Sequence, residues 1–313
     1  MPFKRVPQTF TSAINTVTIG TGENAVKLGG ENTLPLYFFD GPCENPPRIG
    51  VELSDLGPSL DLPGIAKYYA GCSSIVEQAV RASEMPGADF LCLYLDSADP
   101  NGKNTSVADC ASLCKEVAAA ISKPLAIMGC EDAKKNGELL ERLAQELAGE
   151  NVLLLSATED NYKGIAAAAG LAYGHKLGAQ SAVDVNLAKQ LNVLINQLGV
   201  KSESVVMDIG SGAVGYGFEY LVSTMERIKL AALGQSDKML QMPIVTPVSK
   251  EAWSVKEAIA PEADFPQWGP LEQRGIDMEI ATAAACLAAG SNAVILMHPD
   301  AVATLSRLIC KLT

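Results

Sequence analysis

The chain has 313 residues, of which 48% are hydrophobic and 5% aromatic, and it carries a formal net charge of −12. An acidic chain without any run of Lys or Arg repels polyanions, so nucleic-acid partners are not expected. The N-terminal residues lack the apolar core of a secretory signal, and no apolar stretch reaches about 18 residues without strong breakers. We therefore expect a cytoplasmic protein without a membrane partner.

The first predicted elements lie in an N-terminal extension, residues 13–40. Apolar residues alternate with polar ones around Val17 and again around Val26, which predicts the two strands of a β-hairpin. The segment LPLYFFD at 34–40 is expected to add a third short strand. We interpret the extension as a structural plug.

Eight short apolar segments follow, each with a polar residue at or near its C-terminal end, before a helical stretch. They are RIGVELSD (48–55), DFLCLYLD (89–96), PLAIMGC (124–130), NVLLLSA (151–157), AQSAVDV (179–185), SVVMDIG (204–210), PIVTPVS (243–249) and NAVILMH (292–298). Continuous apolar runs are typical of strands buried on both faces of a parallel sheet. Eight such strands, each followed by a helix, predict an α/β protein with a (β/α)8 TIM barrel. A single domain over 1–313 is expected, with the extension 13–40 closing the barrel bottom.

Helices are predicted where apolar residues recur at helical spacing. The segment 187–198 has a clean apolar stripe, and Asn186 before it is a candidate N-cap. Similar patterns predict helices over 136–148 and 218–233.

One long loop, 249–274, is expected after the seventh strand. Loops of this length in a compact domain are often functional or bind a partner. It contains Trp253 and Trp268, which suit either an interface or packing against the barrel's own helices, and both readings stay open.

In a barrel of this kind the C-terminal ends of the strands form the working face. Polar residues predicted at these ends include Asp96, Thr158, Asp184, Asn186, Asp208, Ser211, Thr246 and His298. None of the eight segments contains Lys, which argues against a Schiff-base aldolase. The chain has only His175 and His298, too few for a metal hydrolase of this fold, and His175 is expected at a helix end or in solvent.

The eight cysteines are dispersed, and none forms a C-x-x-C pair. A disulfide framework is not expected in so large and apolar a chain, and Fe–S ligands usually come in closely spaced runs. Most of these cysteines are therefore predicted to be small buried hydrophobes.

A G-x-G-x-x-G pattern occurs at Gly210, Gly212 and Gly215, after a predicted strand and before a predicted helix. Three readings stay open. The pattern suits a dinucleotide-binding turn. It also suits close approach of backbone to a broad, flat ligand, or merely a tight turn into a helix.

The sequence resembles the small (delta) subunits of corrinoid iron–sulfur proteins over nearly its whole length. The resemblance rests on EDNYKGIAAA (159–168), AKQLNVLIN (188–196), GYGFEYLVSTMERIKLAALG (215–234), DKMLQMPIV (237–245), EAWSVKEAIAP (251–261) and FPQWGPLEQRGI (265–276). The stretches GYG…MER and EAW…KEA…P…WG are specific to that family.

The resemblance implies a barrel related to pterin-dependent methyltransferases, in a heterodimer with a large subunit. That partner would carry a [4Fe–4S] cluster and a corrinoid-binding domain, so a cobalamin would lie between it and the C-terminal face of this barrel. The complex would take a methyl group from methyltetrahydrofolate through a separate methyltransferase. It would deliver the group to CO dehydrogenase/acetyl-CoA synthase in the reductive acetyl-CoA pathway. This chain would supply no catalytic residue and no metal ligand.

The residues expected to contact the corrinoid are Asn186, Gly210, Ser211 and Gly212, followed by Thr158, Asp208, Thr246 and His298. Hydroxyl, amide and carboxylate groups beside bare glycine backbone suit the amide edge of a corrin ring. An alternative stays open, because an acidic rim also suits the ring N–H groups of a pterin, which Asp96, Asp184 and Asn186 would bind. The chain would then be a methyltransferase that binds methyltetrahydrofolate directly. A nucleotide-binding barrel is the third reading.

Overall fold

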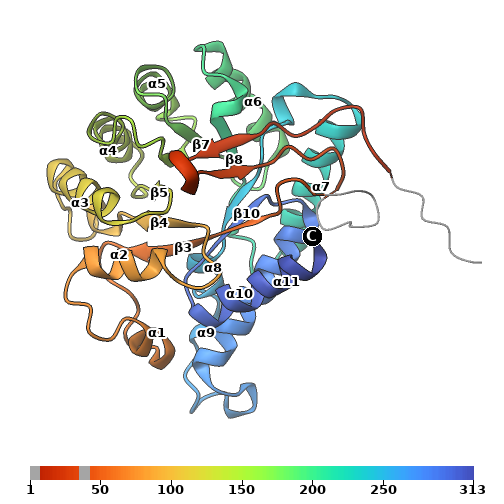
Figure 1. Ribbon diagram of the computed structural model, residues 1–313. Coiled ribbons are helices and arrows are strands. Elements are labelled where there is room, and N and C mark those ends of the chain that lie inside the picture. Colours follow the sequence, from red (N-terminus) through yellow and green to blue (C-terminus); the bar gives the residue numbers. More distant parts are fainter. Residues whose placement is uncertain (1–7, 35–42) are drawn as a thin grey trace, which may run out of the picture.

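The computed structural model describes residues 8–34 and 43–313, and these form a (β/α)8 barrel (Figure 1). Its parallel strands are β3 (Arg48–Ser54), β4 (Phe90–Tyr94), β5 (Leu125–Met128), β6 (Leu153–Ala157), β7 (Lys176–Gln180), β8 (Val205–Asp208), β9 (Val245–Pro247) and β10 (Ala293–Leu296). Their order in the sheet is β8-β7-β6-β5-β4-β3-β10-β9. A parallel bridge between Met207 and Ile244 joins the two ends. The predicted fold class is confirmed.

Helices follow the strands and surround the sheet (Figure 1). They are α1 (Pro63–Tyr68), α2 (Ile75–Ser83), α3 (Val107–Ala120), α4 (Ala133–Glu146), α5 (Tyr162–Ile165), α6 (Val185–Gln197), α7 (Phe218–Gly234), α8 (Ser249–Ala252), α9 (Lys256–Ile259), α10 (Leu271–Ala289) and α11 (Pro299–Leu312). A π-helix, Ala166–Ala172, continues α5. Side-chain oxygens cap several N-termini by accepting from backbone N–H groups, as Ser74, Ser106 and Asp132 do.

The fifth barrel strand was predicted too late in the chain. The segment 179–185 was expected, but β7 is Lys176–Gln180. Gly178 at its centre weakens the apolar pattern, yet the position needs a glycine because a Cβ there would overlap Leu155. The predicted N-cap Asn186 is also wrong. Asp184 caps α6, since its Oδ1 accepts from the N–H groups of Asn186 (2.7 Å) and Leu187 (3.2 Å).

The N-terminal hairpin pairs β1 (Val17–Ile19) with β2 (Val26–Leu28) in antiparallel register. Asn151, just before β6, donates from Nδ2 to the carbonyls of Thr18 (2.9 Å) and Gly20 (2.8 Å). The hairpin therefore lies at the N-terminal end of the strands. Residues 35–40 of the expected third strand fall outside the described residues.

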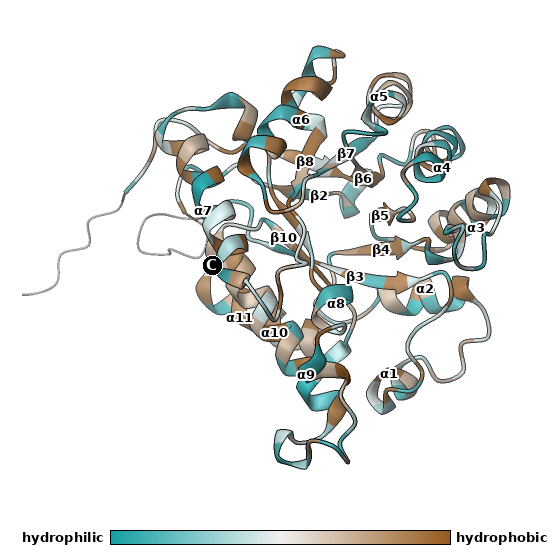
Figure 2. Ribbon diagram, turned by 180° about the vertical axis from the view of Figure 1, so that it is seen from behind, coloured by the Kyte–Doolittle hydropathy of each residue, from teal (hydrophilic) through white to brown (hydrophobic). Residues whose placement is uncertain are grey.

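The apolar core has two parts. One fills the space between the sheet and the helices. The other lies inside the barrel, where the four apolar residues of the hairpin strands join Phe90, Ile295 and other inward-facing side chains. In Figure 2 the barrel strands are largely brown, whereas the helices have both teal and brown surfaces. Each such aliphatic side chain stabilises the fold by roughly 1.5–3 kcal/mol when fully buried.

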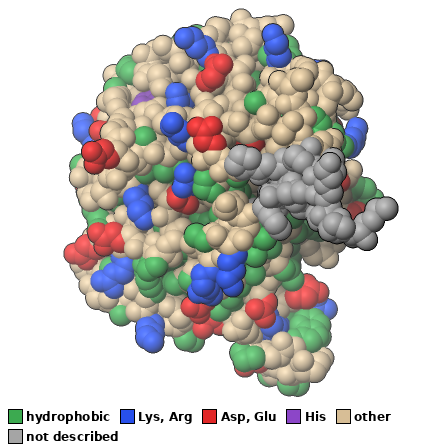
Figure 3. Space-filling model, turned by 45° about the vertical axis from the view of Figure 1, so that its right-hand side comes forward, with side chains coloured by type: hydrophobic (Ala, Val, Ile, Leu, Met, Phe, Trp, Pro, Cys, Tyr) green, Lys and Arg blue, Asp and Glu red, His purple; other side chains and the backbone are tan. Residues whose placement is uncertain are grey.

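The outer surface carries mixed charges. On the face in Figure 3, Lys and Arg side chains are interspersed with Asp and Glu. Among the helices of the described ranges, none combines the length and hydropathy needed to cross a bilayer.

The segment 249–274 contains α8, α9 and a 3-10 turn at Pro266–Trp268. Trp253 packs on the barrel itself, because its Nε1 donates to Glu279 of α10 (3.1 Å) and its ring stacks on His298. Trp268 lies farther out and stacks on Phe265, with ring centroids 4.1 Å apart.

Candidate functional site

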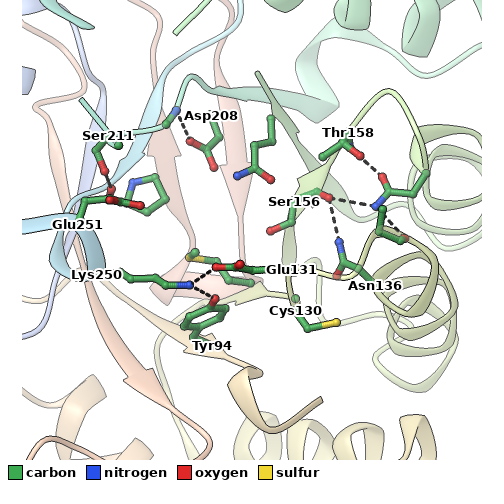
Figure 4. Close-up of a pocket in the computed structure, with 18 residues that line it drawn as sticks. Tyr94, Cys130, Glu131, Asn136, Ser156, Thr158, Asp208, Ser211, Lys250 and Glu251 are labelled. Atoms are coloured by element: carbon green, nitrogen blue, oxygen red, sulfur yellow. Dashed lines mark hydrogen bonds and ion pairs between the residues drawn. The ribbon is translucent and has the colours of Figure 1, made fainter. Parts of the chain in front are cut away.

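A pocket of about 290 Å³ opens at the C-terminal ends of the strands (Figure 4). Its walls come from the ends of β4 to β9 and from the residues that follow them. They include Tyr94, Cys130, Glu131, Asn136, Ser156, Thr158, Gln180, Asp208, Gly210, Ser211, Gly212, Lys250 and Glu251. The pocket therefore lies where a TIM barrel places its binding groups.

Asp208 ends β8 and is 1% exposed. The backbone N–H of Gly210 donates to its Oδ1 at 2.9 Å. Burial raises the pKa of Asp208 to about 6, and this hydrogen bond only partly opposes the rise. The carboxylate is thus a hydrogen-bond acceptor at neutral pH, held in a poorly solvated position.

A network of amides forms the opposite wall. Asn136 of α4 donates from Nδ2 to the carbonyl of Ser156 (3.0 Å), and Asn161 Oδ1 accepts from the N–H of Thr158 (2.7 Å) (Figure 4). Ser156 has φ +71°, a left-handed conformation within β6, where the register to β7 shifts. Among the described residues, two buried oxygens of this wall have no partner, Asn136 Oδ1 and Thr158 Oγ1.

Lys250 lies across the mouth of the pocket (Figure 4). Its Nζ donates to Tyr94 Oη (2.5 Å) and to Glu131 Oε1 (2.6 Å). Burial alone would lower the pKa of Lys250, but the hydrogen bonds to Glu131 and Tyr94 raise it. Burial raises the pKa of Tyr94 to about 12, against the effect of Lys250. At neutral pH the pair is therefore an ammonium donating to a neutral phenol.

A second group of carboxylates consists of Glu52, on β3, and Asp96, which follows β4. Ser249 Oγ donates to Glu52 Oε2 (2.7 Å), and Ser54 Oγ donates to Asp96 Oδ2 (2.7 Å). Burial raises the pKa of Glu52 to about 7 and also raises that of Asp96. Within the described ranges, no three His, Cys, Asp or Glu side chains converge to hold a metal ion.

A wider trough of about 770 Å³ adjoins the pocket along the ends of β7 and β8. It shares Thr158, Gln180, Gly210 and Gly212 with the pocket, and its outer wall includes Tyr216 and Tyr220. These tyrosines are 84% and 67% exposed, so the trough presents aromatic surface to the outside.

Comparison with known sequences decides the family. Residues 16–305 match the family described as CO dehydrogenase/acetyl-CoA synthase delta subunit. The acetyl-CoA decarbonylase/synthase complex subunit delta of Archaeoglobus fulgidus is 35% identical over 296 residues, 92% of this chain and 64% of that protein. Subunit delta 2 of Methanosarcina acetivorans is 34% identical over 92% of this chain and 66% of that protein. The chain belongs to this delta-subunit family. It spans just under two thirds of the length of these two relatives.

Solved structures of dihydropteroate synthase share the fold of this delta-subunit chain. The Xanthomonas albilineans enzyme with 4-aminobenzoic acid has a TM-score of 0.60 at 13% identity, covering 95% of this chain and 98% of that one. Its complex with 7,8-dihydropteroate has a TM-score of 0.54 at 14% identity, covering 87% and 95%. At such low identity the likeness shows the fold alone.

The structure brings five of the eight predicted site residues of the delta-subunit chain together. These are Thr158, Asp208, Gly210, Ser211 and Gly212. Their expected contact with a corrinoid stays a prediction.

Three predicted residues lie away from the pocket and the trough. Asn186 is exposed in the first turn of α6, because β7 ends earlier than expected. Thr246 is fully buried and hydrogen-bonds Ser291 (2.9 Å), before β10, so it points away from the mouth. His298 is 1% exposed and caps α11, accepting from the N–H of Asp300 (3.2 Å).

The glycine pattern does not open a helix. Gly210 and Gly215 have positive φ values of 73° and 87°, so they serve turns. The following helix α7 begins only at Phe218. A dinucleotide-binding turn would place its backbone amides at the N-terminus of the following helix. The structure therefore does not support the dinucleotide-binding interpretation.

Sequence reasoning missed the pocket's cation and its amides. Lys250 lies just beyond the predicted strand segment, and Asn136 is on a helix, so neither was expected at the mouth. His175 does follow a helix end, that of Ala166–Ala172, but its expected exposure to solvent was wrong. The ring is fully buried, where it accepts from the N–H of Val152 and donates to the carbonyl of Ala144.

Proposed function

We propose that this chain covers a corrinoid held mainly by a large partner subunit, within a heterodimeric methyl carrier. The partner would also hold the [4Fe–4S] cluster. The complex would receive methyl groups from methyltetrahydrofolate through a separate methyltransferase and deliver them to CO dehydrogenase/acetyl-CoA synthase. Membership of the delta-subunit family supports a role within that complex.

One observation carries the proposal: the strand ends open into a wide trough with a glycine floor. A Cβ at Gly210 would meet nothing within 4 Å, and one at Gly212 would meet only Glu251, at 3.9 Å. Backbone here is thus accessible to a broad, flat ligand. Tyr216 and Tyr220 supply an exposed aromatic edge beside it.

A bound corrinoid would supply the cobalt atom that carries the methyl group. The residues of this chain would orient the ring and exclude water from one of its faces. Hydroxyl and amide groups of Thr158 and Gln180 fit its amide-bearing edge.

The test is co-expression of this chain with the large subunit. We expect a 1:1 complex with corrinoid absorbance in the visible spectrum, while the isolated chain stays colourless. Gly212→Phe fills the trough and should reduce the corrinoid content. Gly234→Phe is the matched control, because Gly234 is exposed at the end of α7, on the opposite end of the barrel. Equal corrinoid content in both variants would contradict the proposal.

A second candidate is direct binding of methyltetrahydrofolate by this chain. The observation in its favour is Asp208, a buried carboxylate that faces the pocket and can accept from ring N–H groups. Titration of the isolated chain with methyltetrahydrofolate, followed by an assay of methyl transfer to cob(I)alamin, separates the two. Binding with methyl transfer would replace the first proposal by the second.

A further inference from the structure

The chain contains two Asn–Gly dipeptides, and the fold places them in opposite environments. Asn101–Gly102 lies in the exposed turn between the 3-10 turn Asp96–Ala98 and α3. Asn136–Gly137 lies in α4, and both of its residues are buried. The two dipeptides therefore differ in environment but not in chemistry.

An Asn–Gly dipeptide can react with itself. The backbone nitrogen of the glycine attacks Cγ of the asparagine, a C–N bond forms, and the side-chain amide nitrogen leaves as ammonia. Because glycine has no Cβ, nothing beside its nitrogen hinders the attack, and its backbone rotates freely. The main chain must leave its folded conformation for the atoms to meet, so the rate depends on how firmly the fold holds each dipeptide.

The turn holds Asn101–Gly102 loosely. Within the described ranges, the N–H of Asn101 donates to Asp99 Oδ1 (2.7 Å), whereas its side-chain amide makes no hydrogen bond. The N–H of Gly102 donates to the carbonyl of Asp99 (3.0 Å) across the exposed turn. A Cβ at Gly102 would meet only that carbonyl oxygen, at an ordinary 3.6 Å. The turn therefore does not require glycine, and an alanine fits there.

The barrel holds Asn136–Gly137 firmly. Asn136 is 2% exposed, and its Nδ2 donates to the carbonyl of Ser156 (3.0 Å). Both residues of the dipeptide lie inside the hydrogen-bonded helix α4. Attack there would require the helix to open and Nδ2 to leave β6. Opening a packed helix costs much more free energy than opening an exposed turn.

We propose that Asn101 is a site of spontaneous deamidation, at which the folded chain slowly acquires a carboxylate. The nitrogen of Gly102 and Cγ of Asn101 close a succinimide ring, with release of ammonia. Water then opens the ring at either carbonyl, so the products are aspartate or isoaspartate at position 101. The overall change is hydrolysis of one amide by one water molecule, and it needs no oxidant, reductant or enzyme.

The turn is linked to the helix that forms one wall of the pocket. The N–H of Asn104 donates to the carbonyl of Asp99 (3.1 Å), and Asn104 Oδ1 accepts from Lys135 Nζ of α4 (2.5 Å). An isoaspartate adds a methylene to the main chain between Asp99 and Asn104. The longer main chain displaces Asn104 and loosens its contact with Lys135.

The test is incubation of the full chain at mildly alkaline pH, followed by trypsin digestion at mildly acidic pH and peptide mass spectrometry. Cleavage after Lys and Arg places the two asparagines in separate peptides, 82–103 and 136–142. We expect Asn101 to deamidate at least about ten-fold faster than Asn136. Labelling with protein isoaspartate methyltransferase then measures the isoaspartate share of the product.

Gly102→Ala is the decisive variant, because its methyl group hinders the attack but fits the turn. We expect it to slow deamidation of Asn101 at least about ten-fold while the stability stays unchanged. Gly137→Ala is the matched control and should leave the rate at Asn101 as it is. In urea, where neither dipeptide is held by the fold, the two wild-type rates should converge.

The inference is overturned if Asn101 stays intact in the folded chain while the chain in urea deamidates, or if Asn101 and Asn136 react equally fast in the folded chain. Rates that differ as much in urea would also overturn it, since the fold would then not be the cause. Faster hydrogen exchange at the amide of Asn104 in the aged chain, but not in aged Gly102→Ala, would support the link to α4. Unchanged exchange would remove that link. The corrinoid proposal is independent of all these outcomes.

Discussion

Lys250 Nζ lies 2.6 Å from Glu131 Oε1 and joins two loops across the mouth of the barrel. The loops follow β9 and β5, which lie four places apart in the order of eight strands and therefore on opposite sides. This ion pair crosses the entrance, and it limits how far the two loops can separate.

Lys250→Met should therefore loosen the mouth without much loss of stability. The side chains of the pair are 41% and 73% exposed, and exposed pairs contribute less than about 1 kcal/mol. We expect faster amide hydrogen exchange in the loop after β5, while the free energy of unfolding barely changes. Lys189→Met is the control, since it removes another surface pair, Lys189–Asp237, at 2.6 Å. Unchanged exchange in Lys250→Met would show that the pair does not hold the loops.

Glu52 should make stability depend on pH. Burial raises its pKa from 4.5 to about 7, against the hydrogen bond from Ser249, so the folded chain keeps a proton that the unfolded chain has released. The free energy of unfolding should then fall as the pH rises through this range. Glu52→Gln removes the effect, which we expect to be on the order of 1–2 kcal/mol given the solvent that reaches Glu52. Urea unfolding of both proteins across this pH range measures it.

Glu77 provides a control of opposite sign for that experiment. Hydrogen bonds from the N–H and hydroxyl of Ser73 lower the pKa of Glu77 below 4.5. Its contribution is present above that pH and is lost as the pH falls below it. If Glu52→Gln and Glu77→Gln changed the pH dependence in the same direction, the assigned shift of Glu52 would be wrong.

Gly129→Ala should disturb the amide wall of the pocket. A Cβ at Gly129 would overlap Asn136 Oδ1 and lie 2.7 Å from its Cγ. We expect a loss of about 1–3 kcal/mol in the free energy of unfolding, because the buried amide must move and its bond to Ser156 breaks. Gly137→Ala, in α4, adds a Cβ in ordinary contact with Asn161 at 3.5 Å, and it should be neutral or stabilising by up to about 1 kcal/mol. Denaturant unfolding compares the two, and equal stabilities would refute the steric argument.

Lys229→Met should be severely destabilising. Its side chain is fully buried, and its Nζ donates to Glu31 Oε1 (2.8 Å) and Asn292 Oδ1 (2.8 Å). Removing the ammonium leaves a buried carboxylate without its counter-charge, which costs about 3–5 kcal/mol. Adding Glu31→Gln should restore part of the loss. Urea unfolding measures the series, and a loss no larger than that of Lys189→Met would falsify this account.

The barrel could be predicted because buried parallel strands have a simple apolar signature. Seven of the eight predicted segments contain their strand, as 124–130 contains β5. The exception, β7, has Gly178 at its centre, where backbone packing against Leu155 requires the absence of a side chain. Such a requirement comes from a neighbour distant in sequence, so no local pattern reports it.

The site could be predicted only in part. Asp208 is the last residue of its strand and Thr158 directly follows its own, so the rule for parallel strand ends places both at the mouth. Thr246 and His298 also lie in or just after the C-terminal part of a strand, but their side chains do not point into the pocket. Thr246 hydrogen-bonds Ser291, and His298 accepts from the N–H of Asp300. The direction of a side chain at a strand end depends on packing that the sequence alone does not display.

The hairpin of β1 and β2 fills the far end of the barrel with Val17, Ile19, Val26 and Leu28. Among the described residues the barrel interior is packed and closed at that end, so the pocket at the strand ends is approached from the side that Lys250 crosses. A ligand of that pocket must enter and leave on the same side of the barrel. A partner protein bound over that side of the barrel would control both binding and release, and it could set the residence time of the ligand without contacting it.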